Sequence, residues 1–268
     1  MTHSPQNPIK PVKGFLIDID GVLYVEKQVI RGAVESINYL QKNKIPFCLV
    51  TNTTSKSRNT LHTNLQRKGF KLNLEQVFSA PFATAQWLKE QNVSSINLFL
   101  RGDAYREFKD FRITNNKPEY VVIGDVGDDL TYKSLNQAFR LIFNGAKMIA
   151  LQKNRYWLRG DGLAIDAGAI VAALEYAASK KARIIGKPSP DFFQQAIRSI
   201  GIAKENLAMI GDDMEADIIG AAKEGLYTIA VKTGKFGKRS NVKKGLPHLV
   251  LPSIADLPDW LEKQKDSP

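Results

Sequence analysis

Residues 14–23 read GFLIDIDGVL, and the architecture of the chain follows from this segment. The apolar run GFLI leads into two acids, Asp18 and Asp20, that are separated by one residue. A continuous apolar run of this kind is typical of a strand that is buried on both faces of a parallel sheet. Because side chains alternate along a strand, both carboxylates are expected on one face, at the carboxyl end where open α/β sheets carry their active sites.

Strand-like and helix-like segments alternate on either side of this run, which predicts a parallel sheet flanked by helices. The flanking strands are expected at residues 45–51, 182–185, 207–212 and 226–231, and the flanking helices at 33–42, 56–68, 189–200, 215–224 and 252–263.

The middle of the chain has a strand–helix rhythm of its own, with no acid-tipped strand of the catalytic kind. We therefore interpret it as a separate α/β cap domain, residues 81–181, inserted between two core segments, residues 1–80 and 182–268. Its strands are expected at 96–100, 120–124 and 146–151, and its helices at 132–143 and 169–179.

Two further polar motifs follow predicted strands. Thr51 and Asn52, in LVTNTTS, offer a hydroxyl and backbone N–H groups that could hold phosphate oxygens. Lys187, in IIGKPSP, could neutralise a phosphoryl group. Each also has an ordinary explanation: a turn or helix N-cap for the first, and an exposed lysine at a helix start for the second.

A third motif, MIGDDMEAD, places Asp212, Asp213 and Asp217 after another predicted strand. Carboxylate oxygens suit a hard cation such as Mg²⁺. The alternative is that Asp212 or Asp213 caps a helix while Asp217 lies on a solvated face. Any one short motif can match by accident, but four motifs at the carboxyl ends of strands favour a catalytic interpretation.

Together the motifs DIDG (18–21), Thr51, Lys187 and GDD (211–213) resemble those of haloacid dehalogenase-superfamily hydrolases. The block between Thr51 and Lys187 resembles the large α/β cap of subfamily IIA, which contains NagD-like and p-nitrophenyl-phosphatase-like enzymes. The resemblance implies a Rossmann-like parallel-sheet core with an inserted α/β cap, and phosphatase activity.

The resemblance also implies roles for the acids. Asp18 is the expected nucleophile, forming an aspartyl-phosphate, and Asp20 is the expected general acid and base. The expected Mg²⁺ ligands are the carboxylates of Asp18 and Asp212 and the backbone carbonyl of Asp20. In animal members of the most similar branch, Ser stands where this chain has Asp20, which weakens any transfer of their substrate preferences.

Thr51, Asn52 and Lys187 are expected to hold the transferring phosphoryl group. Asp213 and Asp217 are expected around the metal ligands, where they orient waters or Lys187.

Substrate contacts are expected from the loop after the third cap strand, although a basic exposed hairpin is an equal alternative there. Small phosphomonoesters, nucleotides, pyridoxal phosphate, pyrophosphate and N-phosphorylated amino acids all remain open as substrates. The contact candidates are Asn154, Arg155, Tyr156 and Arg159.

Composition narrows the function classes. The net charge is +11, but no nucleic-acid-binding motif accompanies it, so we expect no specific nucleic-acid partner. The lone cysteine, Cys48, excludes an intramolecular disulfide. No apolar run could span a bilayer, and the N-terminal residues carry no secretory signal, so a cytoplasmic location is expected. The resemblance to subfamily IIA also implies that the protein can form a homodimer.

Two rival functions stay open at this point. One is a non-catalytic sensor of a phosphorylated metabolite on the same fold, since fold alone does not fix function. The other is a module that binds nucleic acid or another anionic partner through the basic surface. Within enzymes, dehalogenase or phosphomutase chemistry is the alternative.

Overall fold

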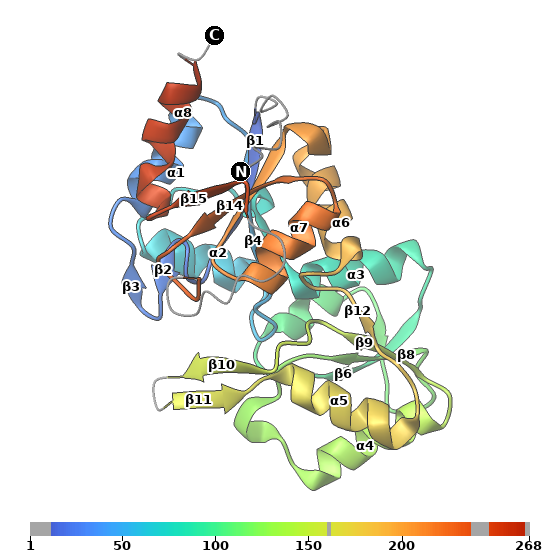
Figure 1. Cartoon of the computed structure of the whole chain (residues 1–268). Coiled ribbons are helices and arrows are strands. Elements are labelled where there is room, and N and C mark those ends of the chain that lie inside the picture. Colours follow the sequence, from blue (N-terminus) through green and yellow to red (C-terminus); the bar gives the residue numbers. More distant parts are fainter. Residues whose placement is uncertain (1–11, 160–161, 237–246, 266–268) are drawn as a thin grey trace, which may run out of the picture. The chain divides into compact units, whose positions relative to one another are not determined.

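The computed structural model describes residues 12–159, 162–236 and 247–265 (Figure 1). The chain forms two compact units: unit 1 is Met1–Leu49, Lys68–Lys71 and Ala196–Pro268, and unit 2 is Val50–Arg67 and Leu72–Gln195. The predicted core and cap boundaries stay a prediction. The expectation about a secretory signal concerns the N-terminal stretch, and most of it, residues 1–11, lies outside the described residues.

The acid-tipped strand is the central element of the first sheet. Strand β1 (Gly14–Asp18) pairs in parallel with β13 (Leu207–Gly211), with Ile17 opposite Ile210, and both strands are buried along their whole length. Such two-sided burial explains their uninterrupted apolar runs. The sheet order is β15-β14-β13-β1-β4-β5, with β1 at Gly14–Asp18, β4 at Phe47–Thr51, β5 at Val77–Ser79, β13 at Leu207–Gly211, β14 at Tyr227–Val231 and β15 at Leu249–Leu251.

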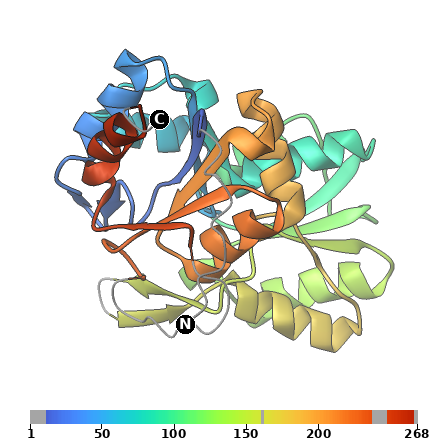
Figure 2. The same cartoon turned by 45° about the horizontal axis from the view of Figure 1, so that its top comes forward.

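Helix α1 (Ala33–Lys42) shows why the helices of unit 1 form where they do. It buries Ala33, Ile37 and Leu40, which are spaced as one face of a helix. Figure 2 shows α1 beside α8 (Leu257–Lys265), and the Ser36 hydroxyl donates to the Ile254 carbonyl at 2.9 Å. The other regular segments are α7 (Gly220–Lys223), the π-helical turn Met214–Ile219, the 3₁₀ turns Lys204–Asn206 and Ile254–Asp256, and the hairpin of β2 (Tyr24–Val25) with β3 (Gln28–Val29).

Unit 2 has a parallel sheet of its own. Apolar residues of α4 (Tyr132–Phe143) and α5 (Ala167–Ala178) pack on it, among them Ile142, Val171 and Leu174. Figure 1 shows these helices side by side on one face. The order is β12-β9-β8-β6-β7, with β6 at Ser95–Phe99, β7 at Arg112–Ile113, β8 at Tyr120–Ile123, β9 at Lys147–Ala150 and β12 at Arg183–Ile184. Unit 2 also contains α2 (Arg58–Arg67), α3 (Ala80–Glu90), α4 (Tyr132–Phe143), α5 (Ala167–Ala178), and the 3₁₀ turns Leu74–Gln76, Ala104–Phe108 and Gly127–Asp129.

The α/β architecture predicted from the sequence is confirmed. A strand is present at the expected place as β12, but its expected position in the sheet of the acid-tipped strand is wrong, because it pairs with β9 in the second sheet. Helix α6 (Pro190–Ile200) follows it, as expected. The elements that were not predicted include α3, β5, β7, β15 and the hairpin of β2 with β3. The loop after the third cap strand forms an antiparallel hairpin of β10 (Tyr156–Arg159) with β11 (Gly162–Ile165), which is the structure that one of its two alternatives required.

The expectations about the lone cysteine and about membrane-spanning segments can be compared with the described residues. Cys48 is buried within β4, which agrees with a small apolar side chain in the core. Among the described residues, every helix is too short or too polar to cross a bilayer.

Candidate functional site

Three carboxylates converge in unit 1, at the carboxyl ends of two neighbouring parallel strands. Asp18 ends β1, and Asp212 directly follows β13; Asp217 comes from the π-helical turn after it. One oxygen from each of the three lies within 4.8 Å of the others. All three side chains are buried, with exposed fractions of 7%, 4% and 0%.

Burial of like charges at this spacing is unfavourable without a cation or a proton. Burial, followed by the charge of Asp217, raises the pKa of Asp212 to about 6. Three buried carboxylate oxygens this close together are the ligand set that a hard divalent cation such as Mg²⁺ prefers. The donor chemistry of the cluster therefore fits the predicted metal.

Asp217 reaches the cluster through an irregular turn. An α-helix was predicted over residues 215–224, but the structure has the π-helical turn Met214–Ile219 and then the short α7. Both Asp217 and Ile218 donate their backbone N–H to the Asp213 carbonyl, at 2.9 and 3.2 Å. π-turns of this kind are frequent at functional sites. The Asp217 carboxylate also accepts from the Asp213 N–H at 3.2 Å.

A loop after β14, residues 232–236, holds the metal-ligand candidates in place. The Lys235 backbone N–H donates to Asp212 Oδ2 at 2.7 Å. The Thr233 hydroxyl donates to the carbonyl of Gly21, in the turn after β1, at 2.6 Å. A Cβ at Gly234 would lie 1.9 Å from Asp212 Oδ2, so the position has room only for glycine. Sequence reasoning missed this loop, although VKTGKF contains it.

The Lys235 ammonium forms an ion pair with Asp213 Oδ2 at 2.7 Å. Burial opposes ionisation of both groups, but their mutual attraction outweighs it: the pKa of Lys235 is raised and the pKa of Asp213 is lowered. Asp213 Oδ1 accepts from the N–H groups of Glu215 and Ala216 at 3.0 Å each. Asp213 is thus a cap for the turn, as its alternative explanation required, and it fixes the backbone that carries Asp212 and Asp217.

The surroundings of Asp20 differ from those of the three clustered carboxylates. Its side chain is exposed, and the Tyr24 hydroxyl donates a hydrogen bond to it. Burial, followed by the negative charge of Asp20, raises the pKa of Tyr24, so the phenol keeps its proton. An exposed carboxylate that accepts from a neutral phenol is suited to exchange a proton with a substrate or with water.

The predicted phosphate-binding residues lie in unit 2, where two of them are joined. The Asn52 amide donates to the Lys187 carbonyl at 2.8 Å, and its oxygen accepts from the Lys187 N–H at 2.8 Å. These two hydrogen bonds to the backbone fix the position of Lys187, which is 3% exposed. The Thr51 hydroxyl, also buried, accepts from the Thr53 N–H at 3.0 Å. That Thr51, Asn52 and Lys187 form one site with Asp18 and Asp212 stays a prediction.

Asn52→Ala should destabilise the protein by about 1–3 kcal/mol, because the N–H and C=O of Lys187 lose their partners in a buried segment. The measurement is urea unfolding, and the control is Asn116→Ala at an exposed bend. Asn52→Asp keeps the acceptor for the Lys187 N–H, so it should lose less. Equal stability of the parent and Asn52→Ala would show that this pair contributes nothing.

The candidate substrate contacts lie at the hairpin of β10 and β11. Tyr156 and Trp157 are exposed, and the Arg155 guanidinium lies 5.9 Å from the Tyr156 ring centre. Two alternatives stay open for this group, substrate contact or a basic exposed hairpin without that role, since a hairpin can also contact a substrate. The group is Asn154, Arg155, Tyr156 and Arg159.

With this geometry in view, the chain can be compared with known proteins. A model of haloacid dehalogenase-like hydrolases matches residues 15–114, and a HAD-hydrolase-like model matches residues 184–257. Haloacid dehalogenase-like hydrolase domain-containing protein 2 of Bos taurus is 37% identical over 227 residues, which cover 85% of this chain and 86% of that protein.

Two further proteins are similar over most of the chain. Human phospholysine phosphohistidine inorganic pyrophosphate phosphatase is 38% identical over 231 residues, covering 84% of each protein. The structure of NagD from E. coli K-12 superimposes with a TM-score of 0.83 at 26% identity, and the match covers 92% of this chain and 98% of NagD.

Proposed function

This chain belongs to the haloacid dehalogenase-like hydrolases, and from that premise we propose that it is a Mg²⁺-dependent phosphatase of small phosphorylated metabolites. The observation that carries the proposal is the buried cluster of Asp18, Asp212 and Asp217 at the carboxyl ends of β1 and β13. The name of the human relative, a phosphatase, supports the same reaction class.

In the proposed reaction, the Asp18 carboxylate attacks phosphorus, and the bond from phosphorus to the leaving oxygen breaks as the aspartyl-phosphate forms. Asp20 gives a proton to the leaving oxygen. It then takes a proton from a water molecule, which attacks the phosphorus and restores the Asp18 carboxylate. The exposed position of Asp20 and its hydrogen bond from Tyr24 support this role.

Asp18 and Asp212 would hold the Mg²⁺ through their carboxylates, Asp20 would hold it through its backbone carbonyl, and Asp217 would complete the negative surroundings. When bound, Mg²⁺ supplies positive charge that offsets the repulsion between an anionic nucleophile and an anionic phosphate. Thr51, Asn52 and Lys187 would hold the phosphoryl oxygens.

The substrate class is the least constrained part of the proposal. A phosphomonoester is the first choice, because Asp20 supplies the acid that an alkoxide or phenoxide leaving group needs. P–N bonds and pyrophosphate are the second choice, from the name of the human relative. A panel of phosphorylated metabolites with purified enzyme would rank them.

Hydrolysis of p-nitrophenyl phosphate is the direct test of the function. We expect turnover with Mg²⁺ that obeys saturation kinetics. Binding of phosphorylated compounds without turnover would favour the sensor function instead. Steeply salt-dependent DNA binding without turnover would favour the anionic-partner function. The cytoplasmic location and the homodimer stay predictions, and sedimentation analysis tests the dimer.

Lys235→Met tests whether the loop after β14 supports the metal site. The variant keeps the backbone N–H that Asp212 accepts but loses the ion pair with Asp213, so Mg²⁺ affinity should fall about 10–100-fold. Mg²⁺ titrations followed by thermal shift and by activity measure it. Lys232→Met, at an exposed neighbour, is the matched control. Unchanged Mg²⁺ affinity in Lys235→Met would remove the ion pair from this role.

A further inference from the structure

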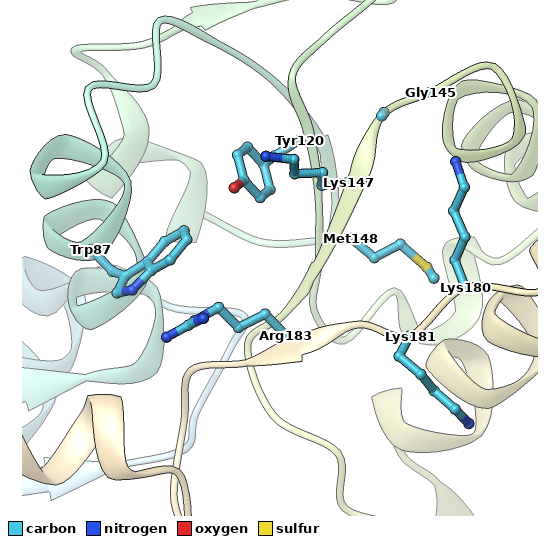
Figure 3. A pocket seen from close by; sticks show the side chains of 9 residues that line it. Trp87, Tyr120, Gly145, Lys147, Met148, Lys180, Lys181 and Arg183 are labelled. Carbon is cyan, nitrogen blue, oxygen red and sulfur yellow. The ribbon is translucent and has the colours of Figure 1, made fainter.

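Unit 2 contains a pocket of about 430 Å³ that the proposed reaction does not use (Figure 3). Tyr120, Lys147 and Arg183 line it, and they are the first residues of β8, β9 and β12. These strands are parallel, so the pocket lies at the amino-terminal edge of the second sheet, away from the carboxyl ends. Its volume falls within the range of about 300–1,000 Å³ that is usual for small-molecule sites.

One wall of the pocket is aromatic and rigid. Trp87 and Tyr120 meet edge to face, with ring centres 5.9 Å apart and planes at 83°. The Arg183 guanidinium lies 4.7 Å from the Trp87 ring centre, and its Nε and Nη2 donate to Asp191 at 2.9 and 3.0 Å. This arrangement fixes a planar guanidinium whose side chain is 51% exposed. A fixed, exposed guanidinium plane is a surface on which an aromatic ring can stack.

The other wall is basic. Figure 3 shows Lys147 beside Tyr120, and the Lys147 ammonium lies 5.5 Å from that ring centre. Lys180 donates to the carbonyl of Ile142 at 2.5 Å. In the described part of the chain, neither lysine forms an ion pair with a carboxylate. Lys181 adds a third ammonium, 89% exposed and 3.8 Å from Glu175.

The carboxylates near the pocket offset only part of its positive charge. Glu175 pairs with Lys153 at 2.7 Å and with Lys181 at 3.8 Å, and Asp191 pairs with Arg183. The lining residues include Lys147, Lys180 and Lys181 but no acid. The pocket is therefore positive on balance, and it combines cations with carbon surface from Met148, the two aromatic rings and the lysine stems.

We propose that this pocket binds a small anion that carries a planar aromatic ring, of the class of a purine nucleoside diphosphate. The ring would stack on the guanidinium of Arg183 beside Trp87, and the phosphates would take hydrogen bonds from Lys147 and its neighbouring lysines. This binding does not depend on the carboxylate cluster, so an experiment can test it separately from the phosphatase activity.

ADP is the probe, added to the full chain in the presence of EDTA so that no divalent ion draws it to the carboxylate cluster. Trp87 lies in the wall, so we expect a saturable change in tryptophan fluorescence. Isothermal titration should give the same Kd. Trp87→Phe should bind ADP but lose the fluorescence change, because the remaining tryptophans, Trp157 and Trp260, do not line the pocket.

The decisive variant is Lys147→Met with Lys181→Met, which removes two charges but keeps the carbon stems. It should weaken ADP binding at least about 10-fold. The control is Lys133→Met, an exposed lysine of α4 that does not line the pocket, and it should bind ADP like the parent.

Three results would overturn the proposal. One is the absence of ADP binding at concentrations up to about 5 mM, since that affinity is too weak to matter. Another is binding that the double variant leaves unchanged, which would place ADP elsewhere. The third is inorganic phosphate binding as tightly as ADP, which would show that the ring contributes nothing.

Discussion

Asp18→Asn should reduce the turnover of p-nitrophenyl phosphate at least about 10³-fold, because an amide cannot attack phosphorus as a carboxylate does. The side chain keeps its shape, so substrate binding should change much less than kcat. The loss should appear in kcat and kcat/KM alike, as expected for a group that acts in the transition state.

The stability of the same variant separates a catalytic loss from unfolding. Asp18 lies among buried carboxylates, so removing its charge relieves repulsion in the metal-free protein. We expect Asp18→Asn in EDTA to melt no lower than the parent. Glu215→Gln, an exposed acid of the same π-helical turn, is the control and should retain parental turnover. Near-parental activity of Asp18→Asn would show that another group is the nucleophile.

Removal of divalent ions should have an effect of similar size. After dialysis against EDTA, turnover should fall to background, and added Mg²⁺ should restore it. The physical reason is that the anionic cluster would otherwise repel an anionic substrate. Exhaustively metal-free enzyme that keeps full turnover would exclude a metal-dependent reaction at this site.

Metal binding has a second readout that needs no substrate. A ligand that binds only the folded state stabilises it, by about 2.7 kcal/mol at a concentration of 100 times Kd. Mg²⁺ should therefore raise the Tm of the metal-free protein. Asp212→Asn should lose this response, and NaCl at equal ionic strength should not reproduce it. A Tm that is unresponsive to Mg²⁺ in the parent would remove Asp212 and Asp18 from the proposed role.

The outcomes for Asp213 and Asp217 show where sequence reasoning about the site was limited. Both were expected around the metal ligands. The side chain of Asp213 caps the π-helical turn and pairs with Lys235, whereas Asp217 lies in the cluster itself. Motif spacing could not separate the two, because the distinction depends on the extra residue that a π-turn accommodates.

Local signals predicted other elements well. Helix α4 has the expected bounds, Tyr132–Phe143, because Thr131 and Ser134 form a capping box at its start. Helix 169–179 was also predicted, but the structure begins it at Ala167, where Asp166 caps the first N–H.

Apolar runs tipped with acids were enough to predict buried parallel strands with acids at their carboxyl ends, because burial and side-chain alternation act between neighbours in the chain. The family followed from the resemblance of the four motifs. Folding in space settled the rest: the partner of β12, the closeness of Asp217 to Asp18, and the loop of Thr233, Gly234 and Lys235 around Asp212. These features join residues far apart in sequence, and hydrogen bonds and packing between such residues leave no periodic pattern along the chain.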